Sequence, residues 1–350
     1  MVNAADEIVE DATASTNGNA PPKQVAKRLR PSVDLTERYG LVAVWLLVGL
    51  FFWLTQPSFR TLQTVQIIIG SQSTQIAVTL AVIVVVIGGE FDLSVANVLG
   101  AAIGFAGFLN VTHHWPIALT VVVILAGAMV FALINAVIVL KVGVPSIIVT
   151  LGTGTVIMGI TNGICGESVV GPISSGLVKT VSRPIFGLPI SFYFVLLVGG
   201  ILYFVLEHTP FGRHFRFIGT NRDVARLAGL RVNRLRVVSL VTCSTLAALA
   251  GILLVGTSGA ADTSVAPGYL LPAFAGAFLG STTIRPGQFN VWGGFVACLF
   301  LVTGVTGLEL DGLTGWVVDV YNGASLVIAV AVTQIVARQR GKPLRSTLGL

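Results

Sequence analysis

Polar side chains that could bind a solute or carry protons interrupt the apolar sequence in the segment GGEFDLSVANVLG at residues 88–100. An apolar run ends there at a glycine pair, and Asp92 or Ser94 can cap the next helix by accepting hydrogen bonds from its free N–H groups. If the flanking runs cross a membrane, such a helix break is tolerated only inside protein or along a polar cavity. We therefore expect four side chains to face the interior, as a structural cap or as part of a solute pathway or gate: Glu90, Asp92, Ser94 and Asn97.

A second polar interruption, LGSTTIRPGQFNVWGG at residues 279–294, repeats this plan of an apolar run, a glycine, a polar turn and a helix rich in small residues. Paired interruptions in the two halves of a membrane protein indicate a translocation site. Four of these side chains can form hydrogen bonds with a hydroxylated solute, although simple turns explain them equally well: Ser281, Thr282, Gln288 and Asn290.

Asp319 and Asn322 form a further polar pair, three residues apart on the last apolar run. Residues at this spacing share a helix face, so the pair could bind a polar solute near the membrane surface. The alternative is that Asp319 is a hydrated acid at the interface.

Motifs for covalent, metal or redox chemistry do not occur in the sequence. It has no HExxH, no GxSxG and no Walker-type GxxxxGK[ST], so we expect no catalytic residue and no ATP hydrolysis by this chain. The three cysteines are widely spaced without a CxxC pair, and the adjacent His113 and His114 lie in a loop, where neighbours seldom converge on one ion. We therefore expect no metal site, no cofactor bound by this chain, and no enzymatic activity.

The elements that must position these polar segments are apolar helices. Of 350 residues, 54% are hydrophobic and only 10% are charged, and the mean hydropathy is +0.89, which excludes a water-soluble globule. Because a spanning helix needs about 20 apolar residues, we predict an all-α polytopic membrane helix bundle of about ten segments. The segments are 40–55, 63–87, 93–110, 117–140, 145–162, 190–206, 235–256, 268–282, 290–307 and 316–337.

The eighth segment, 268–282, differs from the others because it is short and contains Pro272, Gly276 and Gly280. This composition predicts a broken or re-entrant helix that neighbouring helices shield from lipid. Whether it crosses the membrane fully stays open at this point.

Basic residues predict the orientation and the domain limits. If all segments cross, every Lys and Arg except Arg60, Lys179 and Arg183 lies on one side, which the positive-inside rule assigns to the cytoplasm together with both termini. Residues 1–39 are expected to form a disordered cytoplasmic tail, residues 40–337 the membrane domain and residues 338–350 a second cytoplasmic tail. Topology thus explains the net charge of +6, and the expected partner is the lipid bilayer rather than nucleic acid.

The longest polar stretch between segments, residues 207–236, is predicted to contain a short helix. Thr220 or Asn221 can cap its start, Asp223 suits its positive end, and Gly229 is placed to end it. A helix of about eight residues is marginal alone in water, so we expect a surface partner to order it. The alternative is a basic anchor on anionic headgroups. The expected contact face combines apolar side chains with arginines: Val224, Leu227, Ala228, Arg222 and Arg226.

Three motifs together resemble one protein family. They are GGEFDLSV, GRHFRFIGTNRDVARLAGLRVNRLR and PGYLLPAFAGAFLGSTTIRPGQFNVWGG, and over residues 40–337 the chain resembles the membrane permease subunits of bacterial ribose-type sugar ABC importers. The chain departs from the usual family pattern at Glu90-Phe91, at Ala96 and at Arg285-Pro286-Gly287. These departures fall near the expected pathway, so they bear on which solute is carried.

The resemblance implies a permease in the bacterial cytoplasmic (inner) membrane. Two such subunits, identical or different, would form a pathway between a pair of cytoplasmic ABC ATPases, where ATP and Mg²⁺ bind, and an extracytoplasmic solute-binding protein. The helix at 221–229 matches the coupling segment of the family. Carried over residue by residue, this places five residues at the ATPase contact: Gly219, Asn221, Ala225, Arg226 and Gly229.

We therefore expect ATP-driven transport of a monosaccharide or a similar small polar solute. A secondary, ion-coupled transporter is the main alternative, and its activity would survive loss of the ATPase. A membrane-embedded enzyme would need acids or histidines clustered at one depth, and the sequence has no such cluster. A channel would pass solute without ATP.

Overall fold

The computed structural model describes residues 35–70, 72–166, 168–313 and 315–339, with side chains described between Arg38 and Ile335. These residues belong to one compact unit that begins at Leu35. The described chain is almost entirely helical, as predicted, and its two short strands form a single hairpin. The tails expected at both ends lie largely outside the described residues.

The helices follow the predicted segments closely. The first half contains α1 (Leu35–Thr55), α2 (Leu62–Gly70), α3 (Ser73–Ile87), α4 (Val95–Gly107), α5 (Ile117–Val137) and α6 (Ser146–Cys165). The second half contains α7 (Ser175–Ser182), strands β1 (Pro184–Ile185) and β2 (Leu188–Pro189), α8 (Ile190–His208), α9 (Pro210–Thr220), α10 (Arg222–Leu227), α11 (Val232–Ser258), α12 (Leu270–Gly280), α13 (Val291–Leu310) and α14 (Trp316–Gln339). Short 3-10 helices, η1 (Pro57–Arg60) and η4 (Thr263–Tyr269), precede α2 and α12, and π-helical turns, η2 (Phe108–Thr112) and η3 (Ile138–Val142), extend α4 and α5.

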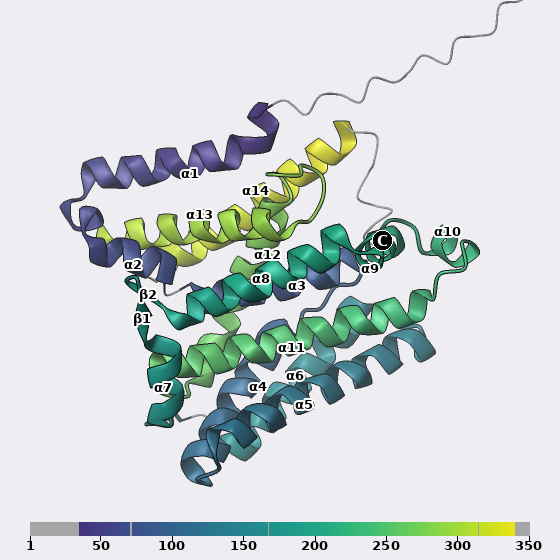
Figure 1. The fold of residues 1–350 in the computed structure, drawn as a ribbon, viewed down its shortest axis with the longest axis horizontal. Coiled ribbons are helices and arrows are strands. Elements are labelled where there is room, and N and C mark those ends of the chain that lie inside the picture. The colour runs from purple at the N-terminus through teal and green to yellow at the C-terminus, as the bar shows by residue number, and fades with distance from the viewer. Residues whose placement is uncertain (1–34, 71, 167, 314, 340–350) are drawn as a thin grey trace, which may run out of the picture. The chain divides into compact units, whose positions relative to one another are not determined.

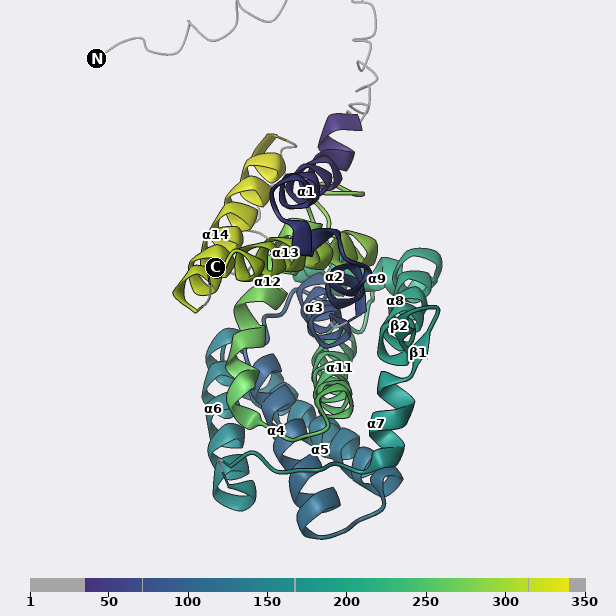
Figure 2. The same cartoon turned by 90° about the vertical axis from the view of Figure 1, so that its left-hand side faces the viewer.

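Helices α3 and α11 form the interior of the bundle. Every residue of α3 is buried, and α11 packs against α3, α4 and α5. Figure 2 shows α11 and α3 near the middle, with α4, α5, α6, α12 and α8 around them. By contrast, α1 and α14 leave most of their apolar side chains exposed. Since apolar side chains are stable against lipid, these outer helices suit a bilayer.

Nine helices in the described part of the chain are long and apolar enough to cross a membrane. They match nine of the predicted segments, and the second of them combines α2 and α3. The remaining predicted segment is interrupted, because η4 covers its start and α12 has only 11 residues. Its predicted broken character is therefore confirmed. Helix α12 packs against α3, α13 and α14, which shield it from lipid.

Small residues allow these buried helices to approach closely. A Cβ atom on Gly280 would lie 2.5 Å from the backbone nitrogen of Gly294, and one on Gly251 would lie 2.7 Å from the carbonyl oxygen of Leu99. Both distances are too short for any side chain, because the neighbouring atoms are backbone. The small residues thus bring backbone against backbone.

The two ends of the bundle differ in their elements. Figure 1 shows α9 and α10 at one end, and α7 with the β1–β2 hairpin at the other. We call the first of these the basic end, because it carries the arginines of the loop between α8 and α11. The two polar interruptions lie at the same end, because ion pairs join each of them to this loop. We call them the first break (residues 88–94) and the second break (residues 281–290).

Candidate functional site

The loop at the basic end contains two helices rather than the one predicted. Helix α9 begins after Thr209, whose side-chain oxygen accepts a hydrogen bond from the Gly212 nitrogen at 3.3 Å. The Thr-Pro pair at 209–210 is a helix-start signal that our sequence analysis missed. Asn221 then caps α10, accepting hydrogen bonds from the nitrogens of Asp223 (3.1 Å) and Val224 (3.0 Å). Of the two predicted caps, Asn221 is therefore the one used.

Helix α10 presents a small apolar and basic surface to its surroundings. Leu227 is 88% exposed and Val224 46% exposed, whereas Ala225 is fully buried. Arg226 is exposed and lies 3.9 Å from Asp223. Gly229, with a φ of 78°, ends the turn in the left-handed conformation that favours glycine. The structure therefore turns Leu227 and Val224 outward, and it turns Ala225, one of the expected contact residues, inward.

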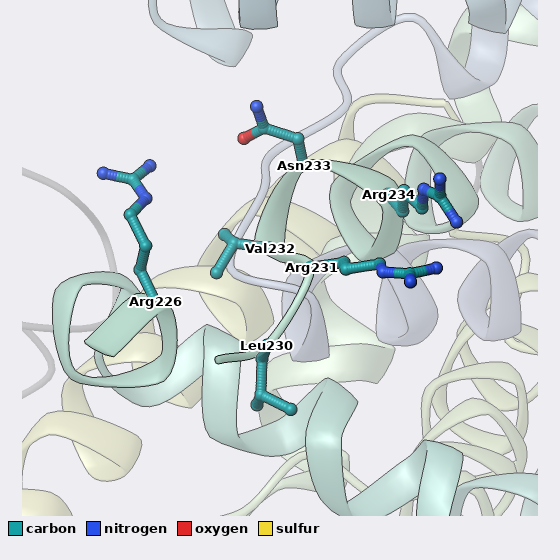
Figure 3. A pocket seen from close by; sticks show the side chains of 6 residues that line it. All are labelled: Arg226, Leu230, Arg231, Val232, Asn233 and Arg234. Atoms are coloured by element: carbon teal, nitrogen blue, oxygen red, sulfur yellow. The ribbon is translucent and has the colours of Figure 1, made fainter. Parts of the chain in front are cut away.

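A shallow pocket of about 390 Å³ lies between α10 and the start of α11. It is lined by Arg226, Leu230, Arg231, Val232, Asn233 and Arg234. Figure 3 shows Arg226 on one side of this pocket and Arg231 with Arg234 on the other, so their guanidinium groups do not converge on one point. The pocket therefore suits an extended acidic surface better than a single small anion.

Gly219, another residue expected at a partner contact, faces the protein instead. A Cβ atom on Gly219 would lie 2.1 Å from the carbonyl oxygen of Ile87 and 3.3 Å from the nitrogen of Gly89. Gly89 has a φ of 76°, and a Cβ atom there would lie 3.1 Å from the Cα of Gly219. The end of α9 thus rests directly on the backbone of the first break.

Glu90 forms the centre of an ion-pair cluster in the first break. Its side chain is only 2% exposed, and its Oε1 accepts hydrogen bonds from Arg222 Nη2 at 2.9 Å and from Arg236 Nε. Arg222 also donates to the carbonyl oxygen of Gly89. Burial of the Arg222 guanidinium lowers its pKa, and the Glu90 carboxylate opposes this change. The cluster joins α10, the base of α11 and the first break, and Arg236 was not among the residues predicted for the site.

The other predicted residues of the first break hold its backbone in place. Asp92 is buried, and its Oδ1 accepts hydrogen bonds from both the nitrogen and the hydroxyl of Ser94. Ser94 occupies the N-cap position of α4, but its side chain accepts no hydrogen bond from the helix, so the predicted capping by Ser94 was wrong. Two free N–H groups of the break donate to hydroxyls of α6: Phe91 to Ser146 at 3.2 Å, and Leu93 to Thr150 at 3.0 Å.

The break is thus buried in protein, as expected for a helix break in a membrane. Asn97 is half-buried on α4, and its amide nitrogen packs against Gly154 of α6. The predicted interior position of these residues is therefore what the structure shows, and a contact with solute stays a prediction.

A second carboxylate connects the loop to the second break. Glu207, at the end of α8, pairs with Arg216 of α9 and with Arg285 of the second break, and its side chain is 6% exposed. Arg216 Nη1 also donates to the carbonyl oxygen of Phe289 at 2.9 Å. Sequence reasoning missed Glu207, although it stands out as an acid in a strongly basic loop.

The predicted polar residues of the second break make contacts within the protein. Asn290 caps α13, accepting from the Gly293 nitrogen at 2.7 Å, and its amide nitrogen donates to the carbonyl oxygens of Gly280 and Thr283, each at 3.1 Å. Ser281 is buried, with its hydroxyl 3.1 Å from that of Thr333.

Two further predicted residues complete this turn. The Thr282 hydroxyl donates to the Leu279 carbonyl oxygen at 2.7 Å, and Gln288 is exposed. Of the predicted four, only Gln288 has an exposed side chain.

Asp319 and Asn322 lie apart from both breaks. They are in the first turns of α14, which follows the end of α13 that is remote from the second break. Asp319 is exposed and Asn322 half-buried. The structure thus does not bring this pair together with the residues of the two breaks.

The described residues also contain no group of three or more His, Cys, Asp or Glu side chains placed to hold a metal ion. The site is instead a set of arginine–carboxylate pairs that joins an exposed helix to two interior breaks. Arg–carboxylate pairs fix geometry, and removing one partner of a buried pair costs roughly 3–5 kcal/mol. This arrangement can pass a displacement of α9 and α10 into the bundle.

The fold is a polytopic bundle of apolar helices with an arginine-rich surface at one end. Residues 65–330 match the family described as "Branched-chain amino acid transport system / permease component". The chain belongs to this family of permease components. This match covers both breaks and the whole loop that contains α9 and α10.

Curated relatives of the chain are import permeases. The chain is 26% identical to the ribose import permease protein RbsC of Escherichia coli strain K12 over 306 residues, which cover 85% of this chain and 94% of the relative. It is 28% identical to the autoinducer 2 import system permease protein LsrD of Photorhabdus laumondii over 311 residues, 85% of this chain and 92% of the relative. LsrD of Yersinia pseudotuberculosis strain YPIII is 27% identical over 314 residues. No solved structure matches the chain.

Proposed function

We propose that this chain is the membrane-spanning subunit of an ATP-driven importer that carries a monosaccharide or a similar small polar solute. The relatives that it resembles along most of its length are named for the import of ribose and of autoinducer 2. The described membrane helices contain few charged side chains, which suits a neutral solute.

The observation that carries this proposal is the exposed face of α10. Leu227 and Val224 project from a six-residue helix that is too short to be stable alone, and arginines surround them. The same loop is fixed to both breaks through Glu90 and Glu207. A subunit that docks on α10 therefore acts on the interior of the bundle through contacts that already exist.

The docked subunit is a cytoplasmic ABC ATPase, on which ATP and Mg²⁺ bind. The basic end then faces the cytoplasm of a bacterium, in agreement with the concentration of arginine there, and both chain termini lie on that side of the inner membrane. A second permease subunit completes the pathway, and a solute-binding protein delivers the solute at the opposite end. Alternation between outward and inward openings follows the closing and parting of the ATPases.

Substitution of Leu227 tests this docking surface. Full burial of a leucine side chain is worth about 1.5–3 kcal/mol, and each 1.4 kcal/mol is tenfold in affinity. We therefore expect Leu227→Asp to weaken association with the ATPase at least about tenfold in a co-purification titration. The stability of the permease should not change, because the Leu227 side chain is 88% exposed.

Val142→Asp is the matched control. Val142 is 70% exposed in the π-helical turn that ends just before α6, outside α10. Its substitution should leave association with the ATPase unchanged. Equal association of the ATPase with the Leu227→Asp variant and the Val142→Asp variant would show that α10 is not the docking surface.

A further inference from the structure

The loop that contains α9 and α10 is connected to the interior in two ways that act in opposite directions. Gly219 lies against the carbonyl oxygen of Ile87, where even a Cβ atom would be only 2.1 Å away, so α9 cannot move closer to the first break without pushing it. Glu90 pairs with Arg222 of α10 at 2.9 Å, so α10 cannot move away without either pulling Glu90 or breaking the pair. The backbone contact transmits a push, and the ion pair transmits a pull.

Glu90 is the most deeply buried member of the ion-pair cluster with Arg222 and Arg236. Its side chain is 2% exposed, against 15% for Arg236 and 36% for Arg222. A carboxylate that has lost its hydration is stable only while its cationic partners remain beside it. Arg236 lies near the start of α11, a long helix of the bundle, so it holds Glu90 in place from the side of the bundle. Arg222 is the more exposed partner and the only one of the two on α10.

The second break is also connected to this loop by ion pairs, but here the carboxylate lies outside the break, at the end of α8. Glu207 is paired with Arg216 of α9 and with Arg285 of the second break. Phe91 of the first break also stacks on Phe274 of α12, with ring centroids 6.3 Å apart. Both breaks are therefore connected to the same loop, and the first break also contacts α12, the helix that leads into the second break.

We propose that Glu90 is the positioning residue that transmits outward movement of α10 to the first break. This inference rests on the proposed function, because it assumes that a nucleotide-driven subunit moves α10. It adds to that function a defined route, through one buried carboxylate, from the docking helix to the interruption between α3 and α4. Glu90 touches no solute in this role and acts through Arg222.

Hydrogen–deuterium exchange of the complete transporter tests the route without knowledge of the solute. The assembled complex of permease and ATPase in nanodiscs is compared with MgATP and with MgADP, and exchange is followed in residues 88–94 and in residues 219–229. In the unaltered protein we expect the nucleotide to change exchange in both segments. The proposed function itself fails if neither segment responds to the nucleotide, and the route then fails with it.

Two substitutions separate the route from simple packing. Arg222→Gln removes the connection to α10 but leaves the buried pair of Glu90 with Arg236, and Glu90→Gln removes the charge. In both variants the response of residues 219–229 should persist, while the response of residues 88–94 should be lost. Glu90→Asp keeps the charge and should restore part of the response.

The control is Asp223→Asn, since Asp223 is an acid on α10 whose side chain is 90% exposed and pairs only loosely with Arg226 at 3.9 Å. It should leave the response of both segments unchanged. If residues 88–94 of the Arg222→Gln complex respond to MgATP as in the unaltered complex, Glu90 does not transmit the movement. If Glu90→Gln does not assemble, Arg222→Gln alone decides the question.

Discussion

Gly219→Ala is the substitution whose effect the structure defines most closely. The new Cβ atom would lie 2.1 Å from the Ile87 carbonyl oxygen, whereas ordinary van der Waals contact begins at 3.4 Å. The end of α9 and the first break must therefore separate by about 1.3 Å, the difference between these distances. Both surfaces are backbone, so no change of rotamer can relieve the contact.

The cost follows from this forced separation. Overpacking of a close contact typically costs about 1–3 kcal/mol. The better helix propensity of alanine, about 1 kcal/mol in a helix interior, offsets only part of it, because Gly219 is next to the last residue of α9. Arg222 follows the end of α9 by only two residues. The separation therefore also stretches the 2.9 Å ion pair between Arg222 and Glu90.

Thermal unfolding of the purified permease measures this effect. We expect the Tm of Gly219→Ala to fall, by no more than about 2–4 °C for each kcal/mol lost, the range for proteins of 150–250 residues. Gly200→Ala in α8 is the control, because nothing lies within 4 Å of a Cβ atom at that position, and its Tm should not fall. An unchanged Tm for Gly219→Ala would refute the close contact between α9 and the first break.

Two further predictions concern the second break and the orientation. Asn290→Ala should lower the free energy of unfolding by about 0.5–2 kcal/mol, because α13 loses its cap. Thermal melts should detect this loss. Gln288→Ala is the control, because the Gln288 side chain is exposed, and its melting temperature should not change. A cysteine replacing Phe186, which is 97% exposed at the hairpin tip, should react with a membrane-impermeant maleimide in intact cells. A cysteine replacing Leu227 should react only after the cells are opened, and the reverse pattern would invert the proposed orientation.

The fold was largely predictable because each membrane helix is encoded by a continuous apolar stretch of sequence. Apolar runs of sufficient length define the membrane segments, and the short, glycine- and proline-containing run at 268–282 correctly predicted the interrupted η4–α12 element. The Asn221 cap was also predictable, because a cap depends on residues only two or three positions apart. Helix α9 was not predicted, because its aromatic and basic residues do not resemble a membrane segment.

The contacts of the site depend on pairs that are distant in sequence, and these were not predictable. Glu90 and Arg236 are 146 positions apart, and Glu207 and Arg285 are 78 apart, so no local pattern connects them. Likewise, a small residue such as Gly219 suits a partner surface or an internal contact equally well, and only the position of Ile87 decides between them. Glu90 itself was identified, since an acid in an apolar sequence carries a cost that function or pairing must explain.

Transport by reconstituted vesicles tests the central claim most directly. The permease is placed in vesicles alone or with its ABC ATPase, and uptake is measured for the solute that the cognate binding protein retains on purification. We predict accumulation against a gradient only when the ATPase, the loaded binding protein and MgATP are all present. Uphill accumulation by the permease alone, driven by an imposed ion gradient, would contradict the account.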